Sequence, residues 1–350
     1  MHGTIAYFIR RFLLIIPTFI GITMLSFGVM QCVPGGPVEQ MVMSMQMSAM
    51  SGGEAGGAGG DMGMGATIPE DALEEIKKFY GFDKPMYYRY AKWFYNICRF
   101  NLGESYRYCE PVWSMIKERF PISIYFGAIG FFLSYSICIP LGVWKAVKHS
   151  SLFDTGSSVL VFIGYSIPGW AAGIVLLTLF GGGSFWDVFP LGEMRSPPEI
   201  WETMSLSAKV WDQLHHTFLP VLCYVIGQFA ALTILMKNSL MENLGADYVR
   251  TAFAKGLDEK VVIFKHALRN SLIPIATGLG HIFSLILAGS YLIEKVFNID
   301  GIGMLGYTSI VDRDYPVALG ILVIASLLKL IGNIISDMLY CIIDPRIRFS

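Results

Sequence analysis

The chain has 350 residues, of which 54% are hydrophobic and only 15% carry a formal charge. An ordinary soluble domain has roughly 25% charged residues, and the mean hydropathy here is +0.53. So few charges cannot cover the surface of a soluble chain of this length, which argues against a soluble enzyme. The 26 basic and 27 acidic residues nearly cancel, so no overall positive field attracts nucleic acid.

Six apolar runs are long enough to match the ~20 residues that a membrane-spanning helix needs. They cover approximately residues 12–31, 122–144, 156–180, 218–237, 275–294 and 316–341. Continuous apolar runs are typical of helices, whereas the strands of a membrane barrel alternate between apolar and polar residues. We therefore predict an all-α integral membrane protein with six transmembrane helices.

Basic residues in the short connections predict the orientation, because such segments stay on the cytoplasmic side. With both termini inside, the short inner segments hold twelve basic residues and the two short outer connections hold four. The inner residues are Arg10, Arg11, Lys145, Lys148, Lys237, Arg250, Lys255, Lys260, Lys265, Arg269, Arg346 and Arg348, and the outer ones are Arg195, Lys209, Lys295 and Arg313. Both termini are expected to be cytoplasmic.

The first connection, residues 32–120, is long and has two parts. Residues 41–66 contain seven Met and eight Gly without an aromatic residue, a composition that predicts a flexible insertion. The thioethers of Met41, Met43, Met45 and Met47 offer an alternative, a Cu(I) site. The remainder is rich in aromatic residues and is expected to fold against the outer membrane face, where Cys98 and Cys109 are candidates for a disulfide.

The inner loop at 241–273 has the pattern of two short helices. Asp247 and Asp258 are candidate N-caps, and Gly256 suits a positive φ at the end of the first helix. On the second helix, Val261, Phe264 and Leu268 form an apolar stripe at spacings i, i+3 and i+7. That stripe is expected either to lie in the membrane interface or to dock into a partner protein.

These residues resemble the EAA loop of ABC importer permeases, in the form found in dipeptide and oligopeptide permeases. The match lies in Arg250-Thr-Ala-Phe-Ala-Lys-Gly256 and Arg269-Asn-Ser-Leu-Ile-Pro274. Further markers are Arg10-Arg11, Pro34-Gly-Gly-Pro37, Tyr80-Gly-Phe-Asp-Lys-Pro85, Leu102-Gly-Glu-Ser105, Glu294-Lys-Val-Phe297, Gly301-Ile-Gly303, Asp312-Arg-Asp-Tyr-Pro316 and Asp344-Pro-Arg-Ile-Arg348. The Gly-rich insertion and Pro34-Gly-Gly-Pro37 are most similar to the Yej-type branch, which imports peptides and microcin C.

The resemblance implies a type I ABC importer permease fold in a bacterial inner membrane. It implies a second, homologous permease, two ATPases that use ATP and Mg, and a periplasmic solute-binding protein that delivers a peptide. The loop would be the helix that couples the permease to an ATPase, through Arg250, Thr251, Ala252, Phe253, Lys255, Gly256 and Leu257. Phe253 departs from the family, which usually has a basic residue there, and Arg250 occupies the acidic position of the motif.

The chain is accordingly expected to divide into a tail and first helix (1–31), an outer loop (32–120), a permease core (121–341) and a cytoplasmic tail (342–350). Polar and aromatic residues within the spans are candidates for a substrate pathway, since intramembrane polar groups are costly unless they are used. These are Tyr165, Trp170, His281, Lys329 and Asn333. Pro168 and Gly169 are expected to kink the third span. Lys329, Asn333 and Asp337 share one helix face, which either lines a conduit or binds the helix to its neighbours.

Two other functions were weighed against this one. An ion-gradient-driven secondary transporter of small solutes would suit six spans, but it is expected to show inverted repeats and interrupted helices, which the sequence does not indicate. An intramembrane enzyme lacks support because no HExxH or GxSxG motif occurs, and His215-His216 is placed in an outer loop without metal-ligand spacing. The sequence has no Walker A motif. We therefore expect a non-catalytic permease that binds no metal or cofactor, with ATP hydrolysed by a partner.

Overall fold

The structure, a computed structural model, describes residues 2–36, 38–39, 42–43, 74–75, 78, 81–183, 185–279 and 290–343. The chain forms two compact units. The first unit comprises residues 1–15, 118–305 and 327–350, and the second comprises residues 16–117 and 306–326. The insertion 41–66, except Val42 and Met43, lies outside the described residues, as do His281 and the tail from residue 344.

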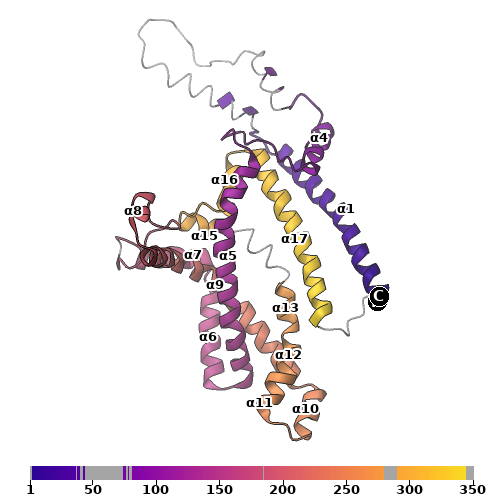
Figure 1. The fold of residues 1–350 in the computed structure, drawn as a ribbon, viewed down its shortest axis with the longest axis vertical. Coiled ribbons are helices and arrows are strands. Elements are labelled where there is room, and N and C mark those ends of the chain that lie inside the picture. Colours follow the sequence, from indigo (N-terminus) through magenta and orange to yellow (C-terminus); the bar gives the residue numbers. More distant parts are fainter. Residues whose placement is uncertain are drawn as a thin grey trace. The chain divides into compact units, whose positions relative to one another are not determined.

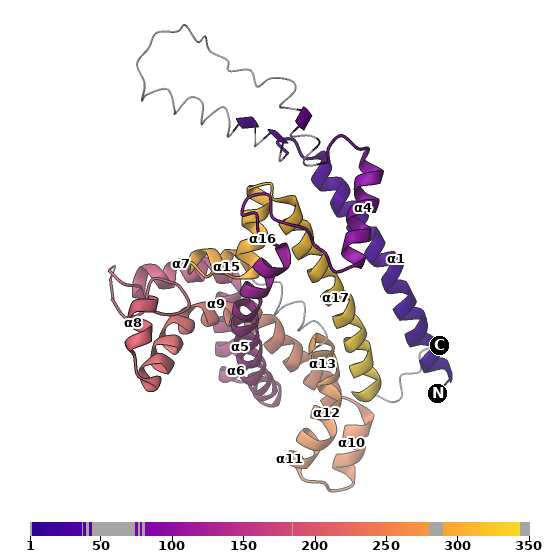
Figure 2. The same cartoon turned by 45° about the horizontal axis from the view of Figure 1, so that its top comes forward.

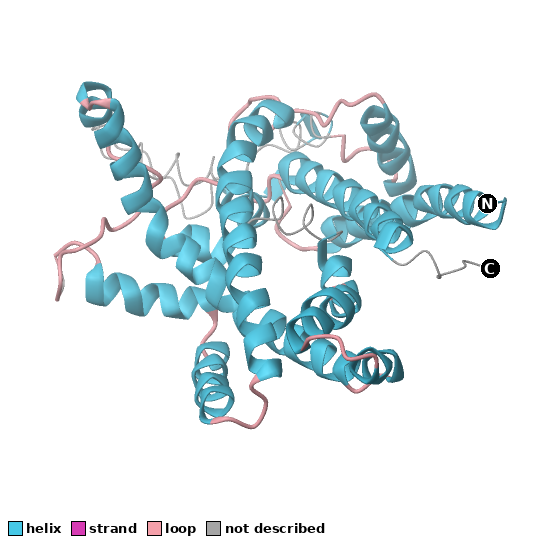
Figure 3. Ribbon diagram, turned by 60° about the horizontal axis from the view of Figure 1, so that its bottom comes forward, coloured by secondary structure: helices cyan, strands magenta, loops and turns pink. Residues whose placement is uncertain are grey.

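The described residues are helical, apart from loops and two isolated β-bridges, as Figure 3 shows. We name the loop at 241–273 the coupling loop, after its predicted role. The helices up to the start of this loop are α1 (His2–Cys32), α4 (Met86–Cys98), α5 (Val112–Val147), α6 (Leu152–Ser166), α7 (Gly169–Phe180), α8 (Pro198–Thr203) and α9 (Leu206–Leu244). Those that follow are α10 (Asp247–Ala254), α11 (Glu259–Val261), the π-helix η2 (Val262–Ala267), α12 (Leu268–Ser271), α13 (Ile273–Leu279), α15 (Tyr291–Val296), α16 (Ile302–Val311) and α17 (Tyr315–Ile343). The all-α prediction is confirmed.

Within the described residues, four helices are long and apolar enough to cross a membrane: Tyr7–Cys32 of α1, α5, α9, and Tyr315–Met338 of α17. The pair α6 and α7 passes the same test jointly, which brings the candidates to five. These five match the first, second, third, fourth and sixth predicted runs. The fifth predicted run, 275–294, lies partly outside the described residues, so the expected number of six remains a prediction.

The third predicted span is broken rather than continuous. α6 and α7 meet at an angle of 92° across Ile167 and Pro168. Proline has no N–H to continue a helix, and Gly169 lies so close to α9 that a Cβ would come within 2.5 Å of the Cys223 carbonyl oxygen. The expected kink is confirmed, and the expectation that the chain lacks interrupted helices is wrong.

The helices α5 and α9 run parallel and share two hydrophobic clusters. Phe126 near the start of α5 packs with residues 219–225 near the start of α9. Cys138, further along α5, belongs to the cluster that contains Met236 and Leu240 of α9. At Gly142 a Cβ would lie 2.6 Å from the Met236 Cβ, so only glycine allows this approach. Because α5 and α9 run in the same direction, the chain between them must travel back to the level at which α5 began. The bent α6–α7 pair makes this return (Figure 1).

The helix α9 begins earlier than its apolar run suggests. Ser205 caps it by accepting a hydrogen bond from the Ala208 N–H, so His215 and His216 lie within the helix and not in an outer loop. His216 lies 2.9 Å from the Gly192 carbonyl oxygen through Nδ1 and 3.6 Å from an Asp212 carboxylate oxygen through Nε2. The carboxylate of Asp212, one turn earlier in α9, thus lies beside His216, although the sequence indicated no carboxylate partner there. This contact helps to hold the His216 ring in place.

In the second unit, α4 packs along the second half of α1 through aromatic rings. The ring centroids of Phe27 and Trp93 lie 5.4 Å apart, and Thr23 and Tyr90 share a hydrogen bond of 3.1 Å. Cys98 and Cys109 have free, exposed thiols, so the expected disulfide is not formed. Aromatic contacts thus contribute to holding α4 against α1.

The loop at 101–111 is joined to residues 312–314 within the same unit. Ser105 donates a short hydrogen bond to the Asp314 carboxylate, and the Tyr106 N–H donates to that carboxylate at 3.1 Å. Ser105 and Asp314 are both buried, and Arg107 pairs with Asp312. These contacts give the loop a fixed shape, because a buried carboxylate needs each of its donors.

Candidate functional site

The first helix of the coupling loop, α10, ends in a defined cap. Gly256 has a φ of +76°, which confirms the prediction for this position. The Gly256 N–H donates to the Phe253 carbonyl oxygen at 2.9 Å, and the Leu257 N–H donates to the Ala252 carbonyl oxygen at 3.4 Å. This pair of bonds is the Schellman motif, which satisfies carbonyl groups that a helix end leaves free. The chain therefore turns sharply at Gly256.

Only part of the capping prediction at the helix starts is right. The N-cap of α10 is Ala246, and Asp247 is its first helical residue, with no side-chain capping bond. Asp247 instead lies in the first turn, where its charge favours the positive end of the helix dipole. Asp258 does occupy the N-cap of α11, although its side chain also makes no capping bond.

The second helix of the loop is continuous in direction but contains the π turn η2 at its centre. The wider turn places Val262, Ile263 and Ala267 in the interior, whereas Val261 and Phe264 stay exposed. Of the expected apolar stripe, Leu268 packs against the core, and the other two residues face outward. A π turn inserts one extra residue and shifts the buried face, so the helix has one apolar side packed against the bundle and another that is exposed.

The inner side of the coupling loop is fixed to α5 and α9. Val249, Ala252 and Val262 belong to the hydrophobic cluster that contains Met236 and Leu240 of α9 and residues 138–146 of α5. At the exit of the loop, the Ser239 hydroxyl donates to the Ser271 carbonyl oxygen at 2.9 Å. The Ser271 hydroxyl lies 2.8 Å from the Ala267 carbonyl oxygen and 3.3 Å from the Ser239 carbonyl oxygen, so its single proton is shared between them. Figure 2 shows α10, α11 and α12 grouped together beside α13. Both ends of the loop are thereby tied to α9.

The outer side carries five exposed large hydrophobic residues, which we name the coupling surface. They are Tyr248, Phe253, Leu257, Val261 and Phe264. Phe264 is the most exposed of the five, at 57%. Exposed apolar residues concentrated on a segment with a fixed backbone are typical of protein interaction sites.

The seven residues expected to couple to an ATPase divide between these two sides. Ala252 is buried in the core and therefore acts as an anchor rather than a contact. The other six are exposed: Arg250, Thr251, Phe253, Lys255, Gly256 and Leu257. Arg250 pairs with Asp247 at 3.6 Å on the outside of α10. Tyr248, Val261 and Phe264 complete the surface, and of these Val261 and Phe264 were identifiable from their spacing.

A buried ionic cluster joins α5, α6 and α9 in the same unit and was not anticipated. The Lys237 Nζ lies 2.7 and 2.8 Å from the two carboxylate oxygens of Asp154. The Lys145 Nζ, on a side chain that is only 1% exposed, lies 3.3 Å from the same carboxylate and donates to Ser157 and Ser158. The sequence predicts Lys145 and Lys237 only to be cytoplasmic charges. They brace three helices around one carboxylate.

Glu294 explains two of the sequence markers. Its carboxylate accepts a hydrogen bond from the Met304 N–H at 2.6 Å, in the first turn of α16, and lies 3.4 Å from the Ser123 hydroxyl. A Cβ on Gly301 would lie 2.6 Å from this carboxylate, and one on Gly303 would lie 3.0 Å from it. The glycines therefore leave room for a buried carboxylate that caps α16 and joins it to α5.

The residues expected along a substrate pathway do not form a single site. Tyr165 and Trp170 lie on either side of the break between α6 and α7, and both are exposed. On α17, Lys329 is exposed and Asn333 is half-buried. Within the described residues, no hydrogen bond joins one pair to the other. His281 lies outside the described residues.

Asp337, the third polar residue of the stripe on α17, is buried and forms an ion pair with Arg11 of α1. This contact favours the interpretation that the stripe binds α17 to a neighbouring helix, although the partner is Arg11 and not Lys329.

Among the described residues, no group of three His, Cys, Asp or Glu side chains is placed to hold a metal. Of the four alternating methionines, only Met43 is described.

Comparison with known proteins gives a consistent result. Residues 138–349 match the family described as binding-protein-dependent transport system inner membrane component. The inner membrane ABC transporter permease protein YejB of Escherichia coli O157:H7 is 40% identical over 99% of both chains. The peptidoglycan transport system permease protein YejB of Agrobacterium fabrum is 39% identical over 99% of this chain and 98% of its own. The oligopeptide transport system permease protein AppB of Bacillus subtilis is 34% identical over 98% of this chain and 99% of its own.

The matched region contains the coupling loop, the bent α6–α7 pair and the Glu294 site. The family implies partner ATPases and a solute-binding protein, and with the apolar helices it establishes a multi-pass protein of the inner membrane. The chain belongs to the binding-protein-dependent transport system inner membrane components, as an ABC transporter permease subunit.

Proposed function

We propose that this permease imports peptides or peptide-like compounds, driven by ATP hydrolysis in ATPase subunits that dock on the coupling surface. The chain itself has no catalytic role in this proposal, and ATP and Mg are used by the partner. A second, homologous permease completes the pathway across the membrane. Support for the substrate class comes from the relatives, whose names refer to oligopeptide and peptidoglycan transport.

The observation that carries the proposal is the two-sided construction of the coupling loop. One side is locked into the core of α5 and α9 through Val249, Ala252 and Val262. The other side exposes Phe253 and Phe264. A segment that transmits a partner's movement must be rigid toward its own helices and adhesive toward the partner. The coupling loop satisfies both requirements.

The proposed orientation follows from the direction of α5. The long loop 32–111 leads into α5 at Val112, and the coupling loop packs on residues 138–146 near the other end of that helix. A helix of 36 residues is long enough to cross the membrane. We infer that the coupling loop and both termini are cytoplasmic, with the long loop on the periplasmic side, where a solute-binding protein delivers its cargo.

The proposal specifies only the class of substrate. It includes short peptides and peptides linked to other groups, such as peptidoglycan fragments or microcin C-like compounds. Their route is proposed to lie along the bent α6–α7 pair, near Tyr165 and Trp170, with Lys329, Asn333 and His281 as further candidates. Alanine substitution of Tyr165 and Trp170, followed by uptake of radiolabelled peptide, tests that route.

The central experiment makes the double variant Phe253→Asp, Phe264→Asp and purifies the tagged permease. Docking of the ATPase would bury two carboxylates of the coupling surface. They would lose their hydration without gaining a partner charge, which opposes binding. We expect the ATPase to be lost from the purified complex and ATP-dependent peptide uptake to fall by at least tenfold. The anchor of the loop is untouched, so the variant permease should reach the membrane in wild-type amounts.

Leu206→Asp serves as the control, because Leu206 is also a strongly exposed hydrophobic residue but lies at the opposite end of α9. This variant should keep its ATPase and its uptake. Retention of the ATPase by the double variant would contradict the docking proposal. Uptake that persists after ATP is removed and collapses with the ion gradient would instead support a secondary transporter.

A further inference from the structure

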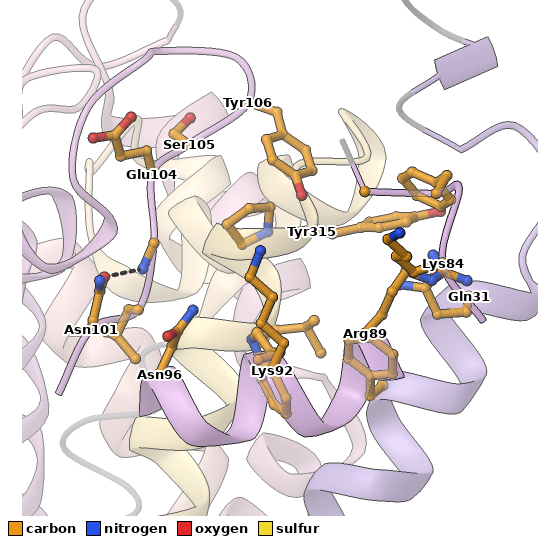
Figure 4. A pocket seen from close by; sticks show the side chains of 18 of the residues that line it. Gln31, Lys84, Arg89, Lys92, Asn96, Asn101, Glu104, Ser105, Tyr106 and Tyr315 are labelled. Carbon is orange, nitrogen blue, oxygen red and sulfur yellow. Dashed lines mark hydrogen bonds between the residues drawn. The ribbon is translucent and has the colours of Figure 1, made fainter. Parts of the chain in front are cut away.

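The second unit contains a cavity of about 920 Å³ that the transport mechanism described above does not use. It lies between α4, the end of α1, the loop 101–109 and the start of α17, all within this unit. Its size falls in the upper part of the roughly 300–1,000 Å³ range of small-molecule sites. We name it the Lys92 cavity, after a lysine of α4 that lines it (Figure 4).

The walls of the Lys92 cavity combine cationic groups with aromatic ones. Four basic side chains face two acidic ones, and the acidic residues are Asp83 and Glu104. Asp83 is already paired with Lys84 at 3.4 Å. The apolar part of the wall includes Phe27, Phe82, Trp93, Leu102, Pro316 and Leu319. Such a lining suits a ligand that is anionic at one point and apolar at another.

Two cationic groups in the cavity have donors to spare. Lys92 is exposed, and its ammonium makes no ion pair or hydrogen bond with any residue that the structure describes, which leaves it available to a ligand in the cavity. The Arg89 Nε is buried and has no acceptor among the same residues, although the Arg89 Nη1 donates to the Gln31 Oε1 at 2.6 Å. A buried N–H without an acceptor is costly, so the Arg89 Nε is expected to be met by an acceptor from water or from a ligand.

The two donors are presented on one side of α4. Arg89, Lys92 and Asn96 follow one another at spacings of three and four residues, so they share a helix face. Figure 4 shows these three side chains extending from α4 toward Tyr106 and Tyr315. The guanidinium of Arg89 lies 4.6 Å from the centroid of the Phe82 ring, which holds it in place.

The opposite wall is equally well fixed. Tyr106 belongs to the loop that Asp314 holds through Ser105, and the Gly103 N–H donates to the Asn101 side chain at 2.9 Å. Tyr315 is itself buried. The cavity is therefore preformed, so a ligand would bind without the cost of ordering its walls.

We propose that the Lys92 cavity binds the free C-terminal carboxylate of a short peptide, with Lys92 and Arg89 as its partners and the aromatic wall receiving an apolar side chain. The choice of a peptide rests on the proposed function. The negative charge of the ligand, by contrast, is inferred from the cavity alone. A single carboxylate has acceptors for both Lys92 and the Arg89 Nε. An acidic surface of the solute-binding protein is the competing occupant, and the experiment separates the two.

The test uses the permease–ATPase complex in nanodiscs of zwitterionic lipid, without the solute-binding protein. Isothermal titration calorimetry measures binding of the tripeptide Ala-Phe-Ala as the free acid and as its C-terminal amide. The wild-type complex should bind the acid at least tenfold more tightly, which corresponds to about 1.4 kcal/mol. Lys92→Gln should abolish that preference, and Lys92→Arg should keep it.

Lys84→Gln is the matched control, because Lys84 lines the same cavity but is already paired with Asp83. It should leave the preference for the acid unchanged. Equal binding of acid and amide by the wild-type complex would overturn the proposal, and so would equal weakening of both by Lys92→Gln. A second measurement adds the solute-binding protein to the same nanodiscs and compares its binding to the wild-type and Lys92→Gln complexes. Weaker binding of that protein by Lys92→Gln, with peptide binding unaltered, would overturn the peptide proposal and assign the cavity to the acidic partner.

The two proposals can fail separately. If the wild-type complex shows no ATP-dependent peptide uptake but still prefers the free acid, the proposed function is wrong and the site stands. If uptake is intact and the preference for the acid is missing, the site is wrong and the function stands.

Discussion

The coupling loop and the Lys92 cavity differ in which side chains they expose and how, and they are proposed to bind two different kinds of partner. The coupling loop projects apolar side chains such as Phe253 and Phe264 from a backbone that is anchored on its inner side. The Lys92 cavity is open to one side and brings the exposed Lys92 together with the buried Arg89 Nε. An exposed apolar surface suits a folded protein partner or the membrane interface, whereas cationic donors that line a cavity suit a small anionic group.

The difference shows where rigidity is needed. The coupling loop takes its rigidity from the helices beneath it, including the core that Met236 and Leu240 share with it. The Lys92 cavity takes its rigidity from local hydrogen bonds such as those of Asp314. Damage to the helices of the first unit should therefore affect coupling first, and three substitutions examine this from the largest effect to the smallest.

Asp154→Ala should have the largest effect, because it removes the carboxylate that Lys145 and Lys237 share. Removal of one partner from a buried ion pair typically costs about 3–5 kcal/mol. We expect a large drop in the thermal transition temperature of the detergent-solubilised permease, measured by the loss of its monodisperse chromatographic peak. Asp247→Ala removes an exposed carboxylate instead and should leave the transition in place. Equal stability of the two variants would show that the buried cluster does not brace α5, α6 and α9.

Gly256→Val should have an intermediate effect, confined to coupling. A β-branched residue resists the φ of +76° on which the end of α10 depends, at a cost of roughly 1–3 kcal/mol. We expect the complex to assemble and hydrolyse ATP while peptide uptake falls by at least tenfold. The measurement is the ratio of peptide transported to ATP hydrolysed in proteoliposomes.

Gly245→Val provides the comparison for Gly256→Val, because Gly245 ends α9 with a φ of -78°, which any residue adopts. This variant should keep a wild-type ratio of transport to hydrolysis. Wild-type transport and hydrolysis in Gly256→Val would show that the turn at this position is not needed for coupling.

Arg250→Ala should have the smallest effect on stability. Arg250 and Asp247 form an ion pair on the exposed side of α10, and such pairs contribute little. We expect no measurable change in the thermal transition temperature, together with a severalfold decrease in ATP-dependent uptake if Arg250 contacts the ATPase as proposed. Arg195→Ala, at another exposed arginine, should change neither quantity. Unchanged uptake in Arg250→Ala would remove this residue from the docking surface.

Much of this organisation could be predicted from local sequence. The apolar runs located the long helices, and Gly256 indicated the turn because few other residues adopt its backbone conformation. Pro168 and Gly169 predicted a kink, but not an angle of 92°. Next to this bend, Gly169 packs closely against Cys223 of α9, a contact that no local pattern reveals.

The features that escaped prediction depend on residues far apart in the chain. Asp154 and Lys237 are separated by 83 residues, and Lys92 and Tyr315 by more than 200. The π turn at 262–267 also has no signature in its sequence, because its extra residue is stabilised by the core against which it packs. Helix caps and spans are local, but ionic clusters and cavities are products of the complete fold.

The paired hydrogen bonds between Ser239 and Ser271 have one more consequence. They fasten the entry and exit of the coupling loop to each other, so the chain between them forms a closed hairpin with its own footprint on α9. Under the docking proposal, substitutions at the exposed residues of this hairpin are expected to change ATPase binding without shifting α5 and α9, because the hairpin is closed by its own contacts.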